Sequence, residues 1–168
     1  MGDTDLMSRR DQIRMTDEEQ REFLRGRHVL NVASLGADGR IHLVAMWYGF
    51  LRPERRSERG IGEEIAFWTY GKSQKILNLK RDPTMTCLVE TGETYDQLKG
   101  VELVGRGVVL EDRETIQEVG ESVWERYTGP VDDDARQAVA AVGAKRVVVR
   151  LDVEKVVTWD HTKLGGRY

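Results

Sequence analysis

The sequence of 168 residues predicts a mainly β fold of the α+β class, in which an antiparallel sheet curls into a barrel flanked by short helices. Short runs of β-branched and aromatic residues alternate with short helical patterns, an order that argues against a doubly wound parallel sheet. The Asp38-Gly39 pair between two such runs is a strong hairpin signal. Gly105 and Gly107 interrupt a later run and indicate a bulge or a close backbone approach, where a barrel can curl.

The N-terminal part of the chain carries a capping box. Thr16-Asp17-Glu18-Glu19 has the hydroxyl-to-glutamate spacing that starts a helix, which predicts a helix over 17–25. We expect Gly26 to end this helix, since the residue just past a helix often needs a positive φ. The runs 28–34 and 40–50 lie on either side of the Asp-Gly turn, and we expect them to pair as an antiparallel hairpin.

The middle of the chain predicts a loop, a strand, a short helix and another strand. Segment 51–62 is rich in Arg, Glu and Gly, and we expect an exposed loop there before a strand over 64–70. The spacing of apolar residues predicts a helix over 73–80. Asp82-Pro83 stops that helix before a strand over 84–91.

The C-terminal part predicts a strand, two helices and a final strand. The first strand covers 101–110, and the helices cover 112–127 and 132–142. The second helix begins with three aspartates, which the helix dipole favours at that end. The final strand is predicted over 145–159.

No internal repeat, low-complexity tract or change in composition marks a domain boundary. Residues 1–168 are therefore predicted to form a single domain, which is large enough to bury one core. Residues 1–15 would be its N-terminal arm and residues 159–168 its C-terminal tail.

The composition excludes several classes of function. A net charge of −3 and a pI near 5.7 give no support to binding of nucleic acid or of a membrane surface. Cys87 is the only cysteine and lies in an apolar run, so it should be a small buried hydrophobe, and disulfide and thiolate–metal frameworks are excluded. No apolar stretch approaches the roughly 18 residues of a membrane span, and no signal peptide is visible, so we expect a cytoplasmic protein.

The segment Phe67-Trp68-Thr69-Tyr70-Gly71-Lys72-Ser73-Gln74-Lys75 carries the most chemical information. It places hydroxyls, ammonium groups and helix-start amides in the turn that follows a strand. Ser73 and the free amides can donate to phosphate oxygens, while Lys72 and Lys75 supply opposing charge. From composition alone, the ordinary interpretation is that both lysines are solvated and that Ser73 only caps the helix.

The run from Phe67 to Pro83, FWTYGKSQKILNLKRDP, resembles without a gap the segment that binds the flavin phosphate in pyridoxamine 5′-phosphate oxidase-like proteins. The resemblance implies a six- or seven-stranded antiparallel split β-barrel with Greek-key topology and flanking short helices. It places cofactor contacts at Trp68, Thr69, Ser73, Gln74 and Lys75, with added charge from Lys72. Gln74 replaces the arginine of the family, which weakens the case for FMN held as in the oxidase.

Nearly the whole chain is similar to the flavin and deazaflavin oxidoreductase group, notably at 8–16, 41–48, 92–95 and 158–164. In that family a strand runs along the isoalloxazine ring with its backbone, which implies cofactor contacts at Val44, Ala45, Met46 and Trp47. From the residues alone, these four are half-buried strand residues. The resemblance also implies a homodimer with the cofactor at the subunit interface. Because the tail WDHTKLGGRY lacks the segments that hold the oxidase substrate, pyridoxamine phosphate is not expected.

The function that these features indicate is an oxidoreductase. It would transfer a hydride between a bound deazaflavin (coenzyme F420) or FMN and a small organic substrate. The group likeness and the departure at Gln74 favour coenzyme F420 over FMN.

Other functions are weighed against this one. A non-catalytic cofactor carrier, or a haem-binding split barrel with His28, His42 or His161 as axial ligand, stays open because fold does not fix function. A dinucleotide fingerprint at 60–65 lacks its third glycine and leads into a strand. No nucleophile with a nearby base and no metal-ligand spacing is present in the sequence.

Overall fold

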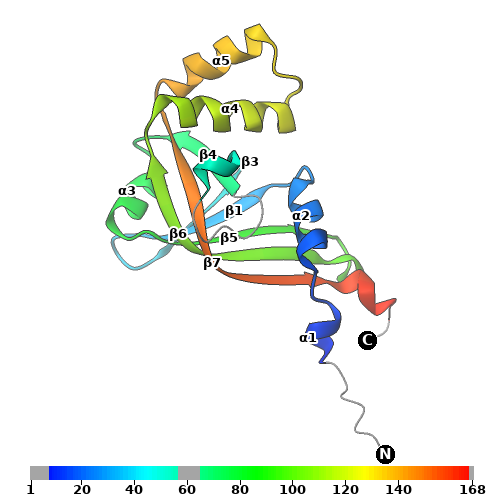
Figure 1. Ribbon diagram of the computed structural model, residues 1–168. Coiled ribbons are helices and arrows are strands. Elements are labelled where there is room, and N and C mark those ends of the chain that lie inside the picture. The colour runs from blue at the N-terminus through cyan, green and yellow to red at the C-terminus, as the bar shows by residue number, and fades with distance from the viewer. Residues whose placement is uncertain (1–7, 57–64, 167–168) are drawn as a thin grey trace, which may run out of the picture.

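The computed structural model describes residues 8–56 and 65–166. Their strands form a single antiparallel sheet in the order β2-β1-β5-β6-β7-β4-β3, which curls into an open barrel (Figure 1). Strands β5, β6 and β7 are neighbours in sequence order, and β4 lies beside β7, which is a Greek-key arrangement. The predicted fold class is confirmed.

The predicted strands and helices lie within two residues of their predicted bounds, with the exception of the run 40–50, and the short helix Arg9–Gln12 was not predicted. The strands are β1 Leu30–Leu35, β2 Ile41–Met46, β3 Gly49–Phe50, β4 Ile65–Tyr70, β5 Thr84–Thr91, β6 Lys99–Leu110 and β7 Arg146–Asp160. The helices are α1 Arg9–Gln12, α2 Asp17–Arg25, α3 Gln74–Arg81, α4 Arg113–Tyr127 and α5 Asp133–Gly143. Residues 57–62 of the expected loop, Glu64 of the expected strand and most of the 60–65 fingerprint lie outside the described residues.

The β1–β2 hairpin forms as expected, but the prediction of one strand over 40–50 is wrong. Strand β2 ends at Met46, and β3 pairs with β4 instead of β1. The break comes at Tyr48, whose side chain is fully buried and donates a hydrogen bond to the Leu24 carbonyl at 2.7 Å. The chain therefore leaves one edge of the sheet at Met46 and joins the other edge at Gly49.

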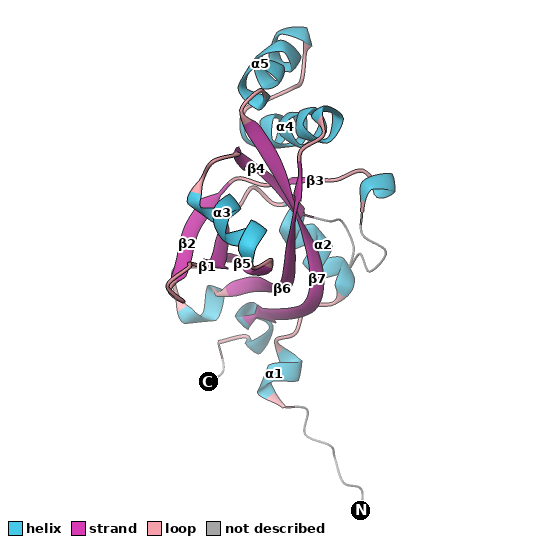
Figure 2. Cartoon of the chain, turned by 90° about the vertical axis from the view of Figure 1, so that its left-hand side faces the viewer, coloured by secondary structure: helices cyan, strands magenta, loops and turns pink. Residues whose placement is uncertain are grey.

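Strands β6 and β7 bend together at Gly105. Their register shifts between Val104 and Gly105, and a Cβ at Gly105 would lie 2.1 Å from the Asp152 carbonyl oxygen. The predicted close backbone approach is therefore confirmed. The bend lets both strands run through the two halves of the barrel, as Figures 1 and 2 show.

Two apolar cores lie on the two sides of the sheet. The larger core fills the barrel and includes Leu30, Phe67 and the buried Cys87, as expected for that cysteine. The smaller core lies between the sheet and α4, where Val119 and Val148 are fully buried. Helices α4 and α5 form a hairpin inserted between β6 and β7, and they cover one end of the molecule (Figure 2).

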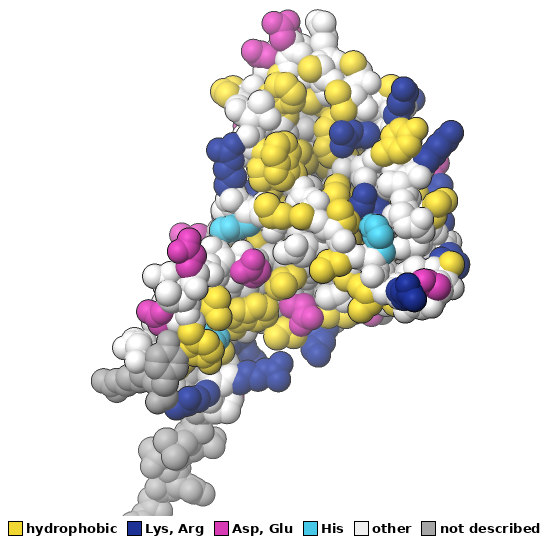
Figure 3. Space-filling model, turned by 180° about the vertical axis from the view of Figure 1, so that it is seen from behind, with side chains coloured by type: hydrophobic (Ala, Val, Ile, Leu, Met, Phe, Trp, Pro, Cys, Tyr) yellow, Lys and Arg dark blue, Asp and Glu magenta, His cyan; other side chains and the backbone are white. Residues whose placement is uncertain are grey.

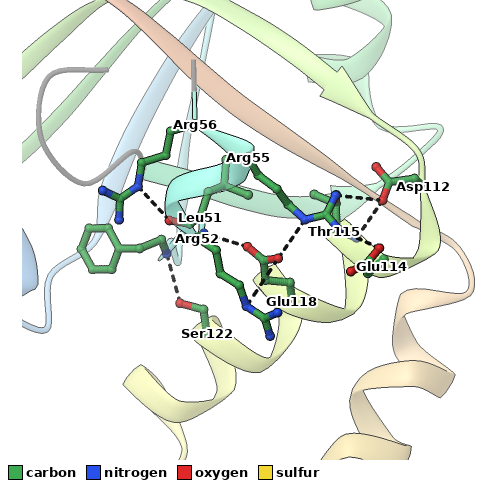
Figure 4. Close-up of polar contacts among 10 residues, drawn as sticks. Leu51, Arg52, Arg55, Arg56, Asp112, Glu114, Thr115, Glu118 and Ser122 are labelled. Carbon is green, nitrogen blue, oxygen red and sulfur yellow. Dashed lines mark hydrogen bonds and ion pairs between the residues drawn. The ribbon is translucent and has the colours of Figure 1, made fainter. Parts of the chain in front are cut away.

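The segment that follows β3 is in part the exposed loop that was predicted: residues 52–54 are exposed, and the burial of Leu51 is the departure. Leu51 is buried, and Arg55 donates to the Glu118 carboxylate of α4 at 3.0 Å (Figure 4). Glu118 also accepts from the Arg52 amide at 2.8 Å, and its side chain is almost fully buried. A buried carboxylate needs such donors, so the Arg52 amide and the Arg55 side chain attach this partly exposed segment to α4.

The chain ends lie together on the side opposite α5 (Figure 1). The Asp160 amide donates to the Ile13 carbonyl at 2.7 Å, and the Met15 amide donates to Thr158 Oγ1 at 2.9 Å. Gly26 ends α2 with φ −59°, so the expected positive φ is wrong. A Cβ there would instead lie 2.4 Å from His28 Nε2. No helix in the described ranges is long and apolar enough to cross a membrane.

Replacement of Glu118 tests the contact that holds α4. We expect Glu118→Gln to lower the free energy of unfolding by about 1.5–3 kcal/mol, because a charged acceptor for Arg55 is lost in a buried place. Glu114→Gln is the matched control, since Glu114 also contacts Arg55 but its side chain is 78% exposed. Glu114→Gln should lower the free energy of unfolding by less than about 0.5 kcal/mol. Urea denaturation measures both, and equal losses would contradict the assignment.

Candidate functional site

The turn between β4 and α3 places the predicted phosphate-binding residues. The Gly71 amide donates to the Lys145 carbonyl at 3.0 Å, which joins the turn to the start of β7. Ser73 is extended, with φ −72° and ψ 156°, and α3 begins after it at Gln74. The first amides of α3 have no intrahelical acceptor, so the turn presents free donors at a positive helix end.

The hydroxyl of Ser73 makes no cap. Its Oγ is buried and has no hydrogen-bond partner in the described part of the chain. A buried hydroxyl without a partner costs free energy, and such a group at a ligand site is explained when a ligand supplies the partner. The interpretation of Ser73 as only a helix cap is therefore wrong.

Lys75 is buried at the same helix end, with only 8% of its surface exposed. Its Nζ donates to Thr69 Oγ1 on β4 at 3.0 Å. Burial, and secondarily the Arg146 guanidinium, lower the pKa of Lys75 below its ordinary value of 10.5, and no carboxylate of the described ranges opposes this shift. Lys75 is thus not the solvated helix residue of the ordinary interpretation, and it has no counter-ion in the part of the chain that the structure describes.

Arg146 is the residue of this site that the sequence did not reveal. It is the first residue of β7 and lies opposite Tyr70 in the β4–β7 register. Its guanidinium lies 4.4 Å from the centroid of the Trp68 ring, and burial lowers its pKa. Because side chains alternate along β4, Trp68 and Arg146 lie on the α4 side of the sheet, and Thr69 points into the barrel toward Lys75.

The side chain of Gln74 is engaged along its own helix. Its Nε2 donates to Asn78 Oδ1 at 2.9 Å, and the buried Asn78 donates onward to Ser34 Oγ at 3.2 Å. Lys72 is exposed and lines a second cavity of about 420 Å³, together with Lys145 and Arg146. Lys72, Lys145 and Arg146 therefore supply positive charge near the turn, where Gln74 replaces the arginine of the family.

A cavity of about 550 Å³, the larger of these two cavities, lies between the end of β2, β4 and the α4–α5 hairpin. Of the predicted contacts, Ala45, Met46, Trp47 and Trp68 line it. Val44 does not, because its side chain packs on the barrel core. Figure 3 shows apolar side chains gathered on this side of the molecule, below the helices. The cavity thus brings Trp68 next to residues 45–47, whereas the predicted phosphate-binding residues Thr69, Lys72, Ser73, Gln74 and Lys75 do not line it.

The helical wall of the cavity was missed at the sequence level, although one signal for it was present. Gly120, Val123 and Trp124 follow the spacing of one helix face and line the cavity from α4. Gly120 is required by packing, since a Cβ there would lie 2.8 Å from the Trp68 ring. The sequence pattern indicates the shared face, but only the fold shows that this face covers β4.

The three histidines lie apart from both cavities. His28 stacks on Phe23 with ring centroids 4.6 Å apart, and burial lowers its pKa. His42 is on β2, and His161 packs edge-on against Tyr95. Within the described ranges, no group of three or more potential metal ligands occurs.

Comparison with known proteins gives one family. The family model described as pyridoxamine 5′-phosphate oxidase matches residues 16–160, which include both cavities and the β4–α3 turn. No curated protein matches the chain.

Solved structures share the fold. A conserved hypothetical protein from Mycobacterium tuberculosis is 39% identical, with a TM-score of 0.85 over 96% of this chain and 95% of the other. An F420 reductase is 20% identical, with a TM-score of 0.57 over 80% of this chain and 93% of the other. A heme storage protein from Vibrio cholerae is 17% identical, with a TM-score of 0.60 over 84% of this chain and 93% of the other. The last two show the fold alone.

Lys75→Met tests whether the buried ammonium destabilises the cofactor-free protein. We expect the variant to be more stable by about 1 kcal/mol at neutral pH, because a buried charge without a counter-ion is removed. The folded-state pKa of Lys75 lies below that of the unfolded chain, so wild-type stability rises with pH through the interval that ends near 10.5. The difference should therefore shrink as pH rises.

Thermal unfolding between pH 7 and pH 10 measures this difference. Lys72→Met removes an exposed lysine from the same turn and should change stability by less than about 0.5 kcal/mol. A Lys75→Met protein that is less stable than wild type at every pH would refute the account.

Proposed function

Because the chain belongs to the pyridoxamine 5′-phosphate oxidase family, we propose that it is an oxidoreductase that binds coenzyme F420 or FMN through the cofactor phosphate. One observation carries the proposal. Lys75 is a buried ammonium at a helix N-terminus with a hydroxyl, and no carboxylate, as its described partner. Such a group is stabilised when an anion binds beside it.

The residues of the turn fit a phosphate group. Lys75 would supply charge, and Ser73 Oγ, which has no described partner, would donate a hydrogen bond. The first amides of α3 would donate as well. Thr69 holds the Lys75 ammonium in place by accepting its hydrogen bond at 3.0 Å.

The ring system would lie in the larger cavity, next to the end of β2. Ala45, Met46 and Trp47 line that wall, and the strand backbone would orient the ring. The bound cofactor supplies hydride transfer, while the apolar walls exclude water and fix the approach of a small organic substrate. Trp47 is itself held by stacking on Tyr127, with ring centroids 4.8 Å apart.

The charge at the turn favours coenzyme F420 over FMN. The phosphodiester of F420 carries one negative charge, whereas the phosphomonoester of FMN carries up to two at neutral pH. Gln74 contributes no charge, and its amide is bonded to Asn78. Lys75 is the buried lysine at the turn and matches the smaller charge, whereas Lys72 and Lys145 are exposed and more strongly screened by solvent. One structural relative is an F420 reductase, which agrees with this choice.

The edge strand β2 supports the proposal of a homodimer. Its outward side chains are apolar and exposed, with Ile41 at 71%, Leu43 at 66% and the following Trp47 at 53%. Exposed apolar residues in a row on an edge strand mark an interaction surface. Since the same strand end lines the larger cavity, a second copy on this face would cover the cofactor ring.

Anaerobic titration of the protein with F420 and with FMN, followed by fluorescence, tests cofactor binding. We expect tight binding of F420 and a loss of at least tenfold in affinity in Lys75→Met, because a buried charged contact to phosphate is removed. Lys80→Met is the control on the same helix, as Lys80 is exposed and pairs with Glu111. It should leave affinity unchanged.

Absence of binding by either cofactor would overturn the proposed function. The same protein would then be titrated with haem, where a Soret band that His42→Ala abolishes would identify a haem-binding protein instead.

Leu43→Asp tests the dimer. Light scattering coupled to size exclusion should show a dimer for wild type and a monomer for this variant, because a carboxylate would be buried at the centre of an apolar contact. Leu77→Asp is the matched control, since Leu77 is 56% exposed on α3, away from β2. A wild-type monomer, or a Leu43→Asp dimer, would contradict the assignment of this face.

A further inference from the structure

The larger cavity extends well beyond the predicted ring contacts. Its far wall is formed by α4 and α5, and its aromatic side chains Trp47, Trp68 and Trp124 come from three separate parts of the chain. Its volume of about 550 Å³ is that of a small-molecule site. Aromatic walls of this kind favour flat, apolar ligands. The cavity can therefore hold more than a ring at the end of β2.

Arg146 provides the one charge in this apolar wall, counted over the described residues that line it. Its Cζ lies 4.4 Å from the centroid of the Trp68 ring, a cation–π contact that restrains its position. Burial is the cause that lowers its pKa, and no described carboxylate counters it. A desolvated guanidinium is suited to a bidentate contact with a carboxylate or similar acid.

We propose that this cavity is the substrate site and that it selects flat, largely apolar molecules with a single acidic group, which pairs with Arg146. The inference rests on the proposed function, because the substrate must lie beside the cofactor ring. The apolar body would lie under the α4–α5 hairpin, against Trp124 and Val139. No second cation occurs among the described lining residues, whose other polar groups are the Thr128 hydroxyl and the indole N–H groups, so a second acidic group would find no counter-charge.

The acid position is separate from the phosphate position. Thr69 and Lys75 meet on the barrel side of β4, and neither lines the larger cavity. Trp68 on β4 and Arg146 on β7 lie on the α4 side of the sheet. The two cations are close enough for Arg146 to affect the titration of Lys75. A cofactor phosphate and a substrate acid would therefore bind side by side, each with its own cation.

Isothermal titration calorimetry with a matched pair of probes tests this assignment on the cofactor-loaded protein. The probes are 1-naphthylacetate and 1-naphthylacetamide, which share a flat apolar body and differ in the charge of one group. Wild type should bind the acid at least tenfold more tightly than the amide, because only the acid pairs with the guanidinium.

Three variants separate the contributions to binding. Arg146→Gln should lower the affinity for the acid at least tenfold and leave the amide unchanged. Lys145→Gln is the control, since Lys145 is the neighbouring cation but lines the other cavity. It should affect neither probe. Ala138→Phe should weaken both probes, because Ala138 lines the larger cavity from α5 and a ring there would fill it.

Cofactor affinity of the same variants keeps the two proposals distinguishable. Arg146→Gln should change it by no more than about threefold. If Arg146→Gln instead lowers cofactor affinity as much as Lys75→Met, the arginine belongs to the phosphate site and the inference is overturned. Equal binding of acid and amide, or no binding of the acid, also overturns it, while the cofactor assignment stands. If neither cofactor binds but the cofactor-free protein still binds the acid through Arg146, the proposed function is overturned and the assignment of Arg146 stands.

Discussion

The joint bend of β6 and β7 at Gly105 is the constraint on which the rest of the molecule depends. Only a residue without a Cβ can approach the Asp152 carbonyl so closely, and the approach allows one strand pair to serve both halves of the barrel. One half carries β5, β1 and β2, and the other carries β4 and β3. Because the sheet curls between them, the end of β2 and the outer face of β4 line the same cavity, although they lie far apart in the sheet order.

The α4–α5 hairpin closes that cavity because α4 is anchored along its length by polar groups. Near its start, the buried carboxylate of Glu118 binds Arg55 and the Arg52 amide. At its end, Arg126 donates to the Gly26 carbonyl at 2.7 Å and lies over the Tyr48 ring at 4.5 Å. Each contact joins α4 to a segment distant in sequence. The cavity wall is therefore held by a few desolvated charged groups, which tolerate little displacement.

Sequence patterns predicted the parts of this structure that depend on local physics. The capping box of α2 and the hairpin turn at Gly39 formed as expected, because their signals lie within a few residues. The run 40–50 failed because the burial of Tyr48 against α2, a long-range contact, overrides local β propensity. Arg146 could not be assigned for a related reason. Its role follows from pairing with β4, which no pattern within β7 specifies.

The same distinction between local and long-range contacts explains why the sequence predicted the proposed phosphate-binding turn and did not predict the proposed acid-binding position. Lys75, Ser73 and Thr69 are close in sequence, whereas Arg146 reaches the site from the far end of the chain. Both cations are desolvated without a carboxylate partner among residues 8–56 and 65–166, and each lowers the stability of the protein without a bound anion. Such groups are retained where another interaction offsets their unfavourable free energy. An anion that binds only the native state provides this, because its binding stabilises the folded protein. Two neighbouring cations of this kind, on opposite faces of the sheet at β4, would be accounted for by the two anionic groups that we propose, one on a cofactor and one on a substrate.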